Sequence, residues 1–314
     1  MTHKPPHAAI VATVLIGTCA GTTWAQSGTP AAPPLQLNRT DASLSPAPEP
    51  PPFSSAADAA GPSGSSTPSA SAAPTDAELA KKLSNPVASL ISVPIQFNYD
   101  TGYGPKDADR VVVNVQPVIP ISIDEDWNLI VRTIVPIIYQ GSLADSIDSE
   151  FGLGDTVQSF FFSPKEPVGG WILAAGPVAL WPTGTEPALR SEQLGLGPTV
   201  LALRQDHGWT YGMLANHIWG VTDSDDHPDV NATFLQPFIS YTWPSATTLA
   251  FNTESTYDWT SEEWTVPLNV VASQMVKIGS QPMQFSLGGR YYADSPDGGP
   301  EWGIRFVVTF LFPK

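Results

Sequence analysis

Apolar and polar side chains alternate along much of the C-terminal part of the chain, and this pattern restricts the fold more than any other feature. Near the end of the chain, Ile304 and Phe306 lie on either side of Arg305. Alternation with the same two-residue period is also present in residues 249–258 and 283–291. Successive side chains of a β-strand point to opposite faces, so the pattern predicts strands with one apolar and one polar face.

The number and length of these runs predict a closed membrane sheet. From residue 87 to residue 314 there are about twelve runs of roughly 10–13 residues, separated by turn residues, as in a small transmembrane β-barrel. Half of each strand would be polar, which fits the mean hydropathy of −0.04. We therefore expect an all-β fold, a transmembrane antiparallel β-barrel of about 12 strands, after a disordered N-terminal segment.

The predicted links alternate in length and charge. Links such as 140–150 and 294–300 are long and acidic, whereas 124–126 is short. Outer-membrane barrels have short periplasmic turns and longer outer loops, so we assign the long links to the cell exterior. Two links depart from this trend, because 260–263 is short and 163–170 is long.

Nine of the ten tryptophans lie at or near predicted strand ends. An indole ring favours the membrane–water interface, which predicts two aromatic girdles. The alternative is a soluble β-protein with core tryptophans, which would not gather at strand ends. The periplasmic girdle would contain Trp127, Trp171, Trp209 and Trp243, and the outer girdle Trp181, Trp219, Trp259, Trp264 and Trp302.

Prolines within predicted strands argue against this layout. Proline removes a ladder donor, and a closed barrel has no edge where the loss is harmless. Either these positions are bulges or some strands are misplaced. The prolines concerned are Pro94, Pro117, Pro136, Pro177, Pro198, Pro237 and Pro267.

The N-terminus predicts export. Residues 1–25 combine a weakly basic start at Lys4, an apolar stretch at 8–20 and small residues before a cleavage site after Ala25, as in a signal peptide. The stretch is too short to span about 30 Å of hydrocarbon as an anchor. Cys19 is the only cysteine, so the mature chain would lack thiols. A lipoprotein signal at Cys19 is the weaker alternative, because Thr18 is unfavourable before it.

Two segments separate the signal from the barrel. Residues 26–75 are mainly Pro, Ala, Ser and Thr and predict a disordered tether. Residues 76–86 predict a short periplasmic helix, because Thr75 and Glu78 have capping-box spacing and Pro86 follows. Residues 87–314 form the barrel domain.

No feature of the sequence predicts catalysis, a metal site or a cofactor. The mature-chain histidines, His207, His217 and His227, lack metal-ligand spacing. The oxygen-rich segment 223–229 lacks the glycine and closing glutamate of an EF-hand loop, so we interpret it as a solvated loop. With 30 acidic and 14 basic residues, the chain is not a nucleic-acid binder. We therefore expect a protein that is not an enzyme and binds no cofactor.

The polar face of the strands predicts the lumen. An arginine facing lipid at the midplane costs about 2–4 kcal/mol, which favours inward placement. Two alternatives remain open, since these side chains could line a path or fill the interior with ion pairs. The principal lumen candidates are Arg132, Glu254, Arg290, Arg305, Asn114 and Gln116, with Gln96, Asn98 and Asn269 as further members. We place Arg132 and Glu254 about half a circumference apart on a twelve-strand wall, with Arg290 and Arg305 on neighbouring strands.

The last run ends on aromatic residues close to the C-terminus. Phe306, Phe310 and Phe312 are similar to the terminal signal that the barrel-assembly machinery reads, although Pro313 and Lys314 follow. The expected partners are this machinery, outer-membrane lipid with lipopolysaccharide, and an unidentified small solute.

Several short strings resemble one family of Gram-negative outer-membrane proteins. The family is described as transporters, in part under the label of phenol meta-pathway (MetA) proteins and in part as neuromedin U. The resemblance extends over about 83–314 and implies a barrel that passes small or aromatic solutes, with no active residues to carry over. The strings are 126–130, 151–156, 161–165, 196–199, 215–219 and 252–259.

These observations predict an outer-membrane β-barrel channel or facilitator for the passive passage of small solutes, including aromatic ones. The main alternative is a structural or interaction barrel whose lumen is filled by side chains, and a barrel-embedded hydrolase is a more distant one.

Overall fold

The computed structural model describes residues 12–13, 18–19, 74–145, 147–223 and 229–312. The predicted cleavage site, most of the predicted signal peptide and nearly all of the tether lie outside these residues, as does most of segment 223–229. Two dipeptides, β1 (Ala12–Thr13) and β2 (Thr18–Cys19), pair with each other. No helix in the described part of the chain is long and apolar enough to cross a membrane.

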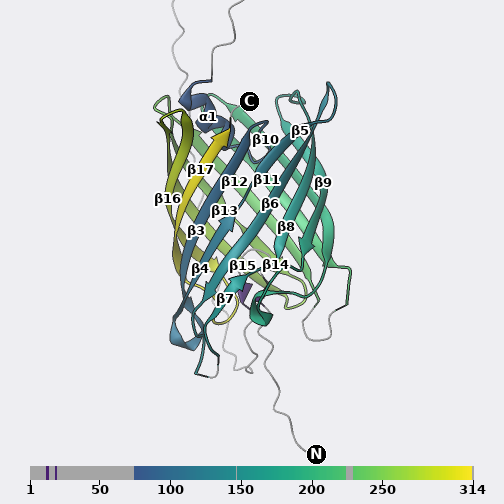
Figure 1. Ribbon diagram of the computed structural model, residues 1–314, viewed down its shortest axis with the longest axis vertical. Helices are drawn as coiled ribbons and strands as arrows, with labels where there is room; N and C mark the ends of the chain where they lie inside the picture. Colours follow the sequence, from purple (N-terminus) through teal and green to yellow (C-terminus); the bar gives the residue numbers. More distant parts are fainter. Residues whose placement is uncertain (1–11, 14–17, 20–73, 146, 224–228, 313–314) are drawn as a thin grey trace, which may run out of the picture. The chain divides into compact units, whose positions relative to one another are not determined.

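The barrel is closed and antiparallel (Figure 1). At three places around the barrel, two successive short strands lie end to end and together do the work of one strand. The fifteen strands therefore make a barrel that is twelve strands around. The predicted fold class is therefore confirmed. The strands are β3 (Ile91–Tyr103), β4 (Ala108–Val115), β5 (Val118–Ser122), β6 (Trp127–Gln140), β7 (Glu150–Leu153), β8 (Thr156–Pro164), β9 (Ile172–Trp181), β10 (Gly195–Asp206), β11 (Trp209–Gly220), β12 (Asn231–Thr242), β13 (Thr247–Thr253), β14 (Ser255–Asp258), β15 (Glu263–Ile278), β16 (Gln281–Asp294) and β17 (Trp302–Phe312). Two short 3-10 turns, η1 (Gly104–Lys106) and η2 (Pro187–Leu189), lie in links at one end.

The last strand closes the barrel on the first. β17 pairs with β3 from Trp302 opposite Thr101 to Phe312 opposite Ile91. Along β17 the alternation predicted from the sequence separates two environments, because Phe306 is 42% exposed on the outside whereas the inward Arg305 is 4% exposed. The polar half of each strand therefore faces the lumen, and the apolar half forms the outer surface.

The prolines lie where the ladders are interrupted. Pro117 falls between β4 and β5, and the register of β15 with β16 shifts at Pro267. Pro177 lies opposite Pro198, and the ladders from these strands to β8 and β11 have gaps there. Before Pro198, Gly197 comes so close to β11 that a Cβ would lie 1.7 Å from the His217 carbonyl oxygen. The predicted conflict is thus resolved by local breaks, and the number of strands is unchanged.

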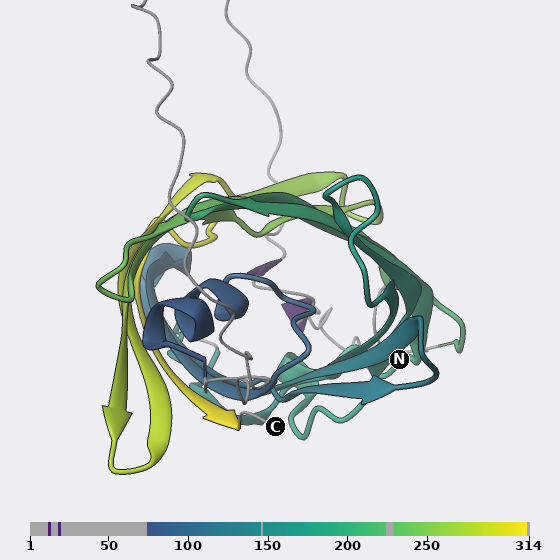
Figure 2. The ribbon, with the colours of Figure 1, turned by 90° about the horizontal axis from the view of Figure 1, so that it is seen from above.

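A short helix lies inside one end of the ring of strands (Figure 2). α1 (Asp76–Leu83) begins with the predicted capping box, in which Thr75 and Glu78 bond each other's backbone N–H groups. The hydrogen bond that the Thr75 backbone N–H donates to the Glu78 carboxylate holds the pKa of Glu78 below its usual range. We call this end of the barrel the helix end and the other the loop end.

The apolar face of α1 anchors it to the barrel. Leu79 and Ala80 are buried in a cluster with Leu90, Met275 and Leu311. In addition, Gln205 Nε2 of β10 donates to the Lys81 carbonyl oxygen at 2.7 Å. So short a helix is marginal in water, and this packing gives the physical reason for its stability.

Candidate functional site: the barrel lumen

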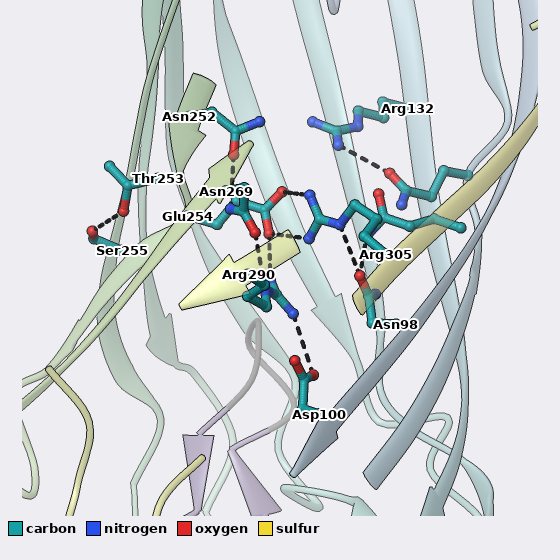
Figure 3. Close-up of polar contacts among 12 residues, drawn as sticks. Asn98, Asp100, Arg132, Asn252, Thr253, Glu254, Ser255, Asn269, Arg290 and Arg305 are labelled. Atoms are coloured by element: carbon teal, nitrogen blue, oxygen red, sulfur yellow. Dashed lines mark hydrogen bonds and ion pairs between the residues drawn. The ribbon is translucent and has the colours of Figure 1, made fainter. Parts of the chain in front are cut away.

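The lumen contains a cavity of about 240 Å³ lined mainly by inward side chains of the polar wall. Its charged residues come from strands that are distant in the sequence, since Asp100 lies on β3, Arg132 on β6, Arg290 on β16 and Arg305 on β17. Figure 3 shows Arg290 and Arg305 converging on Glu254, which lies between β13 and β14, while Arg132 lies apart from them.

Glu254 binds two arginines directly. Arg305 donates from both Nη atoms to the two carboxylate oxygens, at 2.8 and 2.7 Å, in a bidentate pair. Arg290 Nη2 donates to Glu254 Oε2 at 2.7 Å, and Arg290 Nη1 lies 3.3 Å from Asp100 Oδ2. All four side chains are buried, with exposures between 4% and 12%. These four charged side chains therefore form one ion-pair network that joins Glu254 to β3, β16 and β17.

Asparagine side chains orient this network. Arg305 Nε donates to Asn98 Oδ1 at 2.8 Å, and Arg290 Nε donates to Asn269 Oδ1 at 3.1 Å. Asn269 Nδ2 in turn donates to Asn252 Oδ1 at 2.8 Å. Each guanidinium is thus held by both a carboxylate and an amide, which fixes its position against the wall.

The prolines explain the backbone around Glu254. Thr253 lies opposite Leu268 of β15, and the pairing resumes without a shift where Thr256 meets Thr265, so Glu254 faces Pro267. On the other side, the register with β12 puts Pro237 opposite Thr253. Proline donates no backbone hydrogen bond, so both neighbouring strands lack a ladder donor beside Glu254. This accounts for the break between β13 and β14.

Arg132 lies apart from the network. Its Nη2 donates to Gln116 Oε1 at 3.1 Å, and no carboxylate lies within ion-pair distance of it among the described residues. Arg132 and Gln116 line the central cavity and also a second cavity of about 180 Å³ that lies toward α1.

The six principal candidates from the sequence all border the central cavity. Arg290 and Arg305 lie on the neighbouring strands β16 and β17, and both contact Glu254 directly. Asp100 was missed, although it continues the polar alternation of Gln96 and Asn98 on β3. The part these residues take in solute passage stays a prediction.

The wall opposite this network is apolar. Phe161, Leu201, Leu214 and Phe234 belong to one buried cluster that also includes Val87, from the segment after α1. These side chains come from β8, β10, β11 and β12, and Leu214 and Phe234 reach the central cavity. The lumen is therefore polar and charged on one side and apolar on the other.

The remaining predicted residues lie on the outside of the barrel. All nine tryptophans are exposed, and they divide between the two ends as the strand ends predict. Of the C-terminal aromatics, Phe306 and Phe312 are exposed and Phe310 is half-buried. Their roles at the membrane interface and in assembly stay predictions.

The histidines that the structure describes lie away from the charged network. His217 Nδ1 on β11 bonds Thr233 Oγ1 at 2.6 Å, and its ring lies 4.0 Å from that of Trp219. His207 lies in the turn between β10 and β11 and pairs with Asp206 at 2.5 Å.

No family model matches the sequence, and no curated protein matches it. Solved structures are similar to it in fold. An outer membrane channel from Pseudomonas putida F1 superposes with a TM-score of 0.57 at 15% identity, covering 71% of this chain and 96% of that one. Outer membrane phospholipase A from Escherichia coli superposes with a TM-score of 0.42 at 12% identity, covering 70% of this chain and 92% of that one. A BenF-like porin from Pseudomonas fluorescens Pf-5 superposes with a TM-score of 0.25 at 7% identity, covering 72% of this chain and 98% of that one.

The phospholipase match corrects one expectation. We excluded an enzyme because no catalytic motif was visible, but the barrels similar to this chain include an outer membrane phospholipase. The exclusion was therefore wrong as a general statement, although a likeness at 12% identity assigns no activity.

The channel match agrees with the closed wall and its two faces. The apolar outer surface suits a lipid environment. Closure of the sheet pairs the backbone groups of every strand, as a sheet that spans a membrane requires. The chain is an outer-membrane β-barrel, similar in fold to an outer membrane channel.

Proposed function

We propose that this protein is a passive channel for small solutes, as the resemblance to outer-membrane transporters also implies. The observation that carries the proposal is the pair of cavities in the lumen, of about 240 and 180 Å³, which share lining residues between the loop end and α1. A lumen built only for stability would be filled by side chains. Polar groups that border empty space instead support a hydrated path.

The size of the path supports small solutes only. Both cavities are smaller than the 300–1,000 Å³ or so of a pocket for a drug-sized ligand. α1 and the segment after it border the cavity at the helix end and narrow that exit. A protein of this kind would pass solutes slowly and by size.

We infer that the helix end faces the periplasm. Most links at that end are short, such as the turn between β15 and β16, with 165–171 as the exception, whereas the longer links with Asp145 and Asp297 lie at the other end. Short periplasmic turns and longer outer loops are the general arrangement in these barrels. The exposed tryptophans at both ends support a bilayer between them.

One observation favours a closed structural barrel as the second candidate. The apolar cluster joins side chains of four strands to Val87, and α1 occupies the helix end. If this packing seals the lumen, the protein would stabilise the membrane or bind a partner without conducting.

Single-channel recording in planar bilayers separates the two candidates. For a channel, the purified folded barrel conducts ions in discrete steps, and Arg290→Ala shifts its selectivity toward cations, because the variant leaves Glu254 and Asp100 with less positive charge nearby. Arg190→Ala, in the link between β9 and β10, is the matched control and should leave selectivity nearly unchanged. Folded protein that inserts without conducting would establish the closed barrel.

A further inference from the structure

The two lumen cavities meet at three side chains. Gln116, Arg132 and Gln236 line both, and they come from the end of β4, from β6 and from β12. A solute that moves from one cavity to the other therefore passes this ring. We call these three residues the constriction.

Arg132 supplies the charge of the constriction. The carboxylates of Glu254 and Asp100 are engaged by Arg290 and Arg305. Arg132 makes a single side-chain hydrogen bond among the described residues, to Gln116 at 3.1 Å. A guanidinium has five N–H donors in a planar fork, so most of its donors are left for a ligand in the cavity.

An apolar surface borders the same cavity. Leu214 and Phe234 lie on adjacent strands, and the register puts Leu214 opposite Gln236 and Phe234 opposite Asn216. All four side chains line the central cavity. On the wall across the cavity from the arginine network, these two apolar side chains thus lie beside the amides of Asn216 and Gln236.

This combination selects a ligand chemistry. A planar guanidinium binds a carboxylate in a bidentate pair and gains little from a neutral group. Leu214 and Phe234 would bury the apolar part of such a ligand. Arg132 is the one charged side chain among the three residues of the constriction, so a ligand with a single carboxylate is favoured.

We propose that the constriction is a binding site for a small monocarboxylate with an apolar body, its carboxylate on Arg132 and its body on Leu214 and Phe234. This rests on the proposed function for its biological meaning and names the class of solute that the channel retains. The site itself needs only the folded lumen.

Three probes test the proposal in detergent micelles, where binding is measured by isothermal titration calorimetry. Benzoate has the carboxylate and the apolar ring, benzamide has the ring without the charge, and acetate has the charge without the ring. Benzoate should bind at least about tenfold more tightly than benzamide, since a hydrogen bond to a charged group contributes about that factor or more. Benzoate should also bind more tightly than acetate, because only benzoate buries an apolar ring against Leu214 and Phe234.

Variants assign the two halves of the site. Arg132→Gln should weaken benzoate binding about tenfold or more, and Phe234→Ala should weaken benzoate binding while leaving acetate binding unchanged. Arg190→Gln removes the same charge from the link between β9 and β10, where Arg190 pairs with Glu192, and should leave benzoate binding as in the parent. If Arg132→Gln does not fold, Arg132→Lys keeps the charge, loses the bidentate geometry and should show an intermediate loss.

Equal affinity for benzoate and benzamide, or unchanged benzoate binding in Arg132→Gln, would overturn the proposal. Equal affinity for benzoate and acetate would show that Leu214 and Phe234 do not bind the ring, and would also overturn the proposal. The outcome is separate from that of the proposed function. A protein that conducts without binding benzoate refutes this site alone, and one that binds benzoate without conducting refutes the channel alone.

Discussion

At the scale of single residues, Glu254 holds the lumen network together. Among the described carboxylates it is the one in contact with both Arg290 and Arg305, and its side chain is 12% exposed. Glu254→Ala should lower the free energy of unfolding by about 3–5 kcal/mol, because it leaves buried positive charges without their partner. Urea unfolding of the micellar barrel, followed by tryptophan fluorescence, measures the change.

Glu125→Ala is the control for Glu254. Glu125 is exposed in the turn between β5 and β6, so its removal should change stability by less than about 0.5 kcal/mol. The network would be unimportant for stability if the two alanine variants unfolded at the same urea concentration.

At the scale of elements, α1 restricts the helix end through one apolar face. Leu79 is 3% exposed in the cluster with Leu90, Met275 and Leu311. Leu79→Gln should detach the helix, because it buries an unpaired amide in that cluster. The expected result is a higher single-channel conductance from a barrel that still folds.

Lys82→Gln is the matched change on the exposed side of the same helix. It should leave the conductance close to that of the parent. An unchanged conductance in Leu79→Gln would mean that α1 does not narrow the path.

The last strand gives the second prediction for an element. Phe312 is 45% exposed on the outer surface and pairs with Ile91 where the barrel closes. Phe312→Asp puts a charge at this position and changes the predicted assembly signal, so much less heat-modifiable barrel should reach the outer membrane. Ser280→Asp, in the exposed turn between β15 and β16, is the control. A normal amount of folded Phe312→Asp would show that the terminal aromatic is dispensable.

At the scale of the whole molecule, the orientation in the membrane can be tested with single cysteines. If Cys19 leaves with the signal peptide, an introduced cysteine is the only thiol in the mature chain. Cysteines at Asp145 and Asp297, both exposed at the loop end, should react with an impermeant maleimide on intact cells. Cysteines at Glu125 and Lys277, exposed at the helix end, should react only after lysis. The reverse pattern would invert the orientation.

The sequence by itself determined the fold class of this protein and which side chains lie on each face of the barrel wall. A strand has a side-chain period of two, so alternation at Ile304, Arg305 and Phe306 identifies both the strand and its faces without reference to the rest of the chain. Capping is equally local, and Thr75 with Glu78 correctly predicted where α1 begins. The principal lumen residues followed from the same period, because an inward position needs only the phase of its own strand.

Only the tertiary structure decided how those inward residues meet. Glu254 reaches Arg305 across 51 positions of sequence, and which residues lie level depends on the tilt and register of the strands between them. The docking of α1 on Leu311 and the position of Arg132 beyond ion-pair distance of the network carboxylates depend on the same geometry. Local periodicity carries no information on such contacts, because they arise when a sheet closes and brings distant strands around one space.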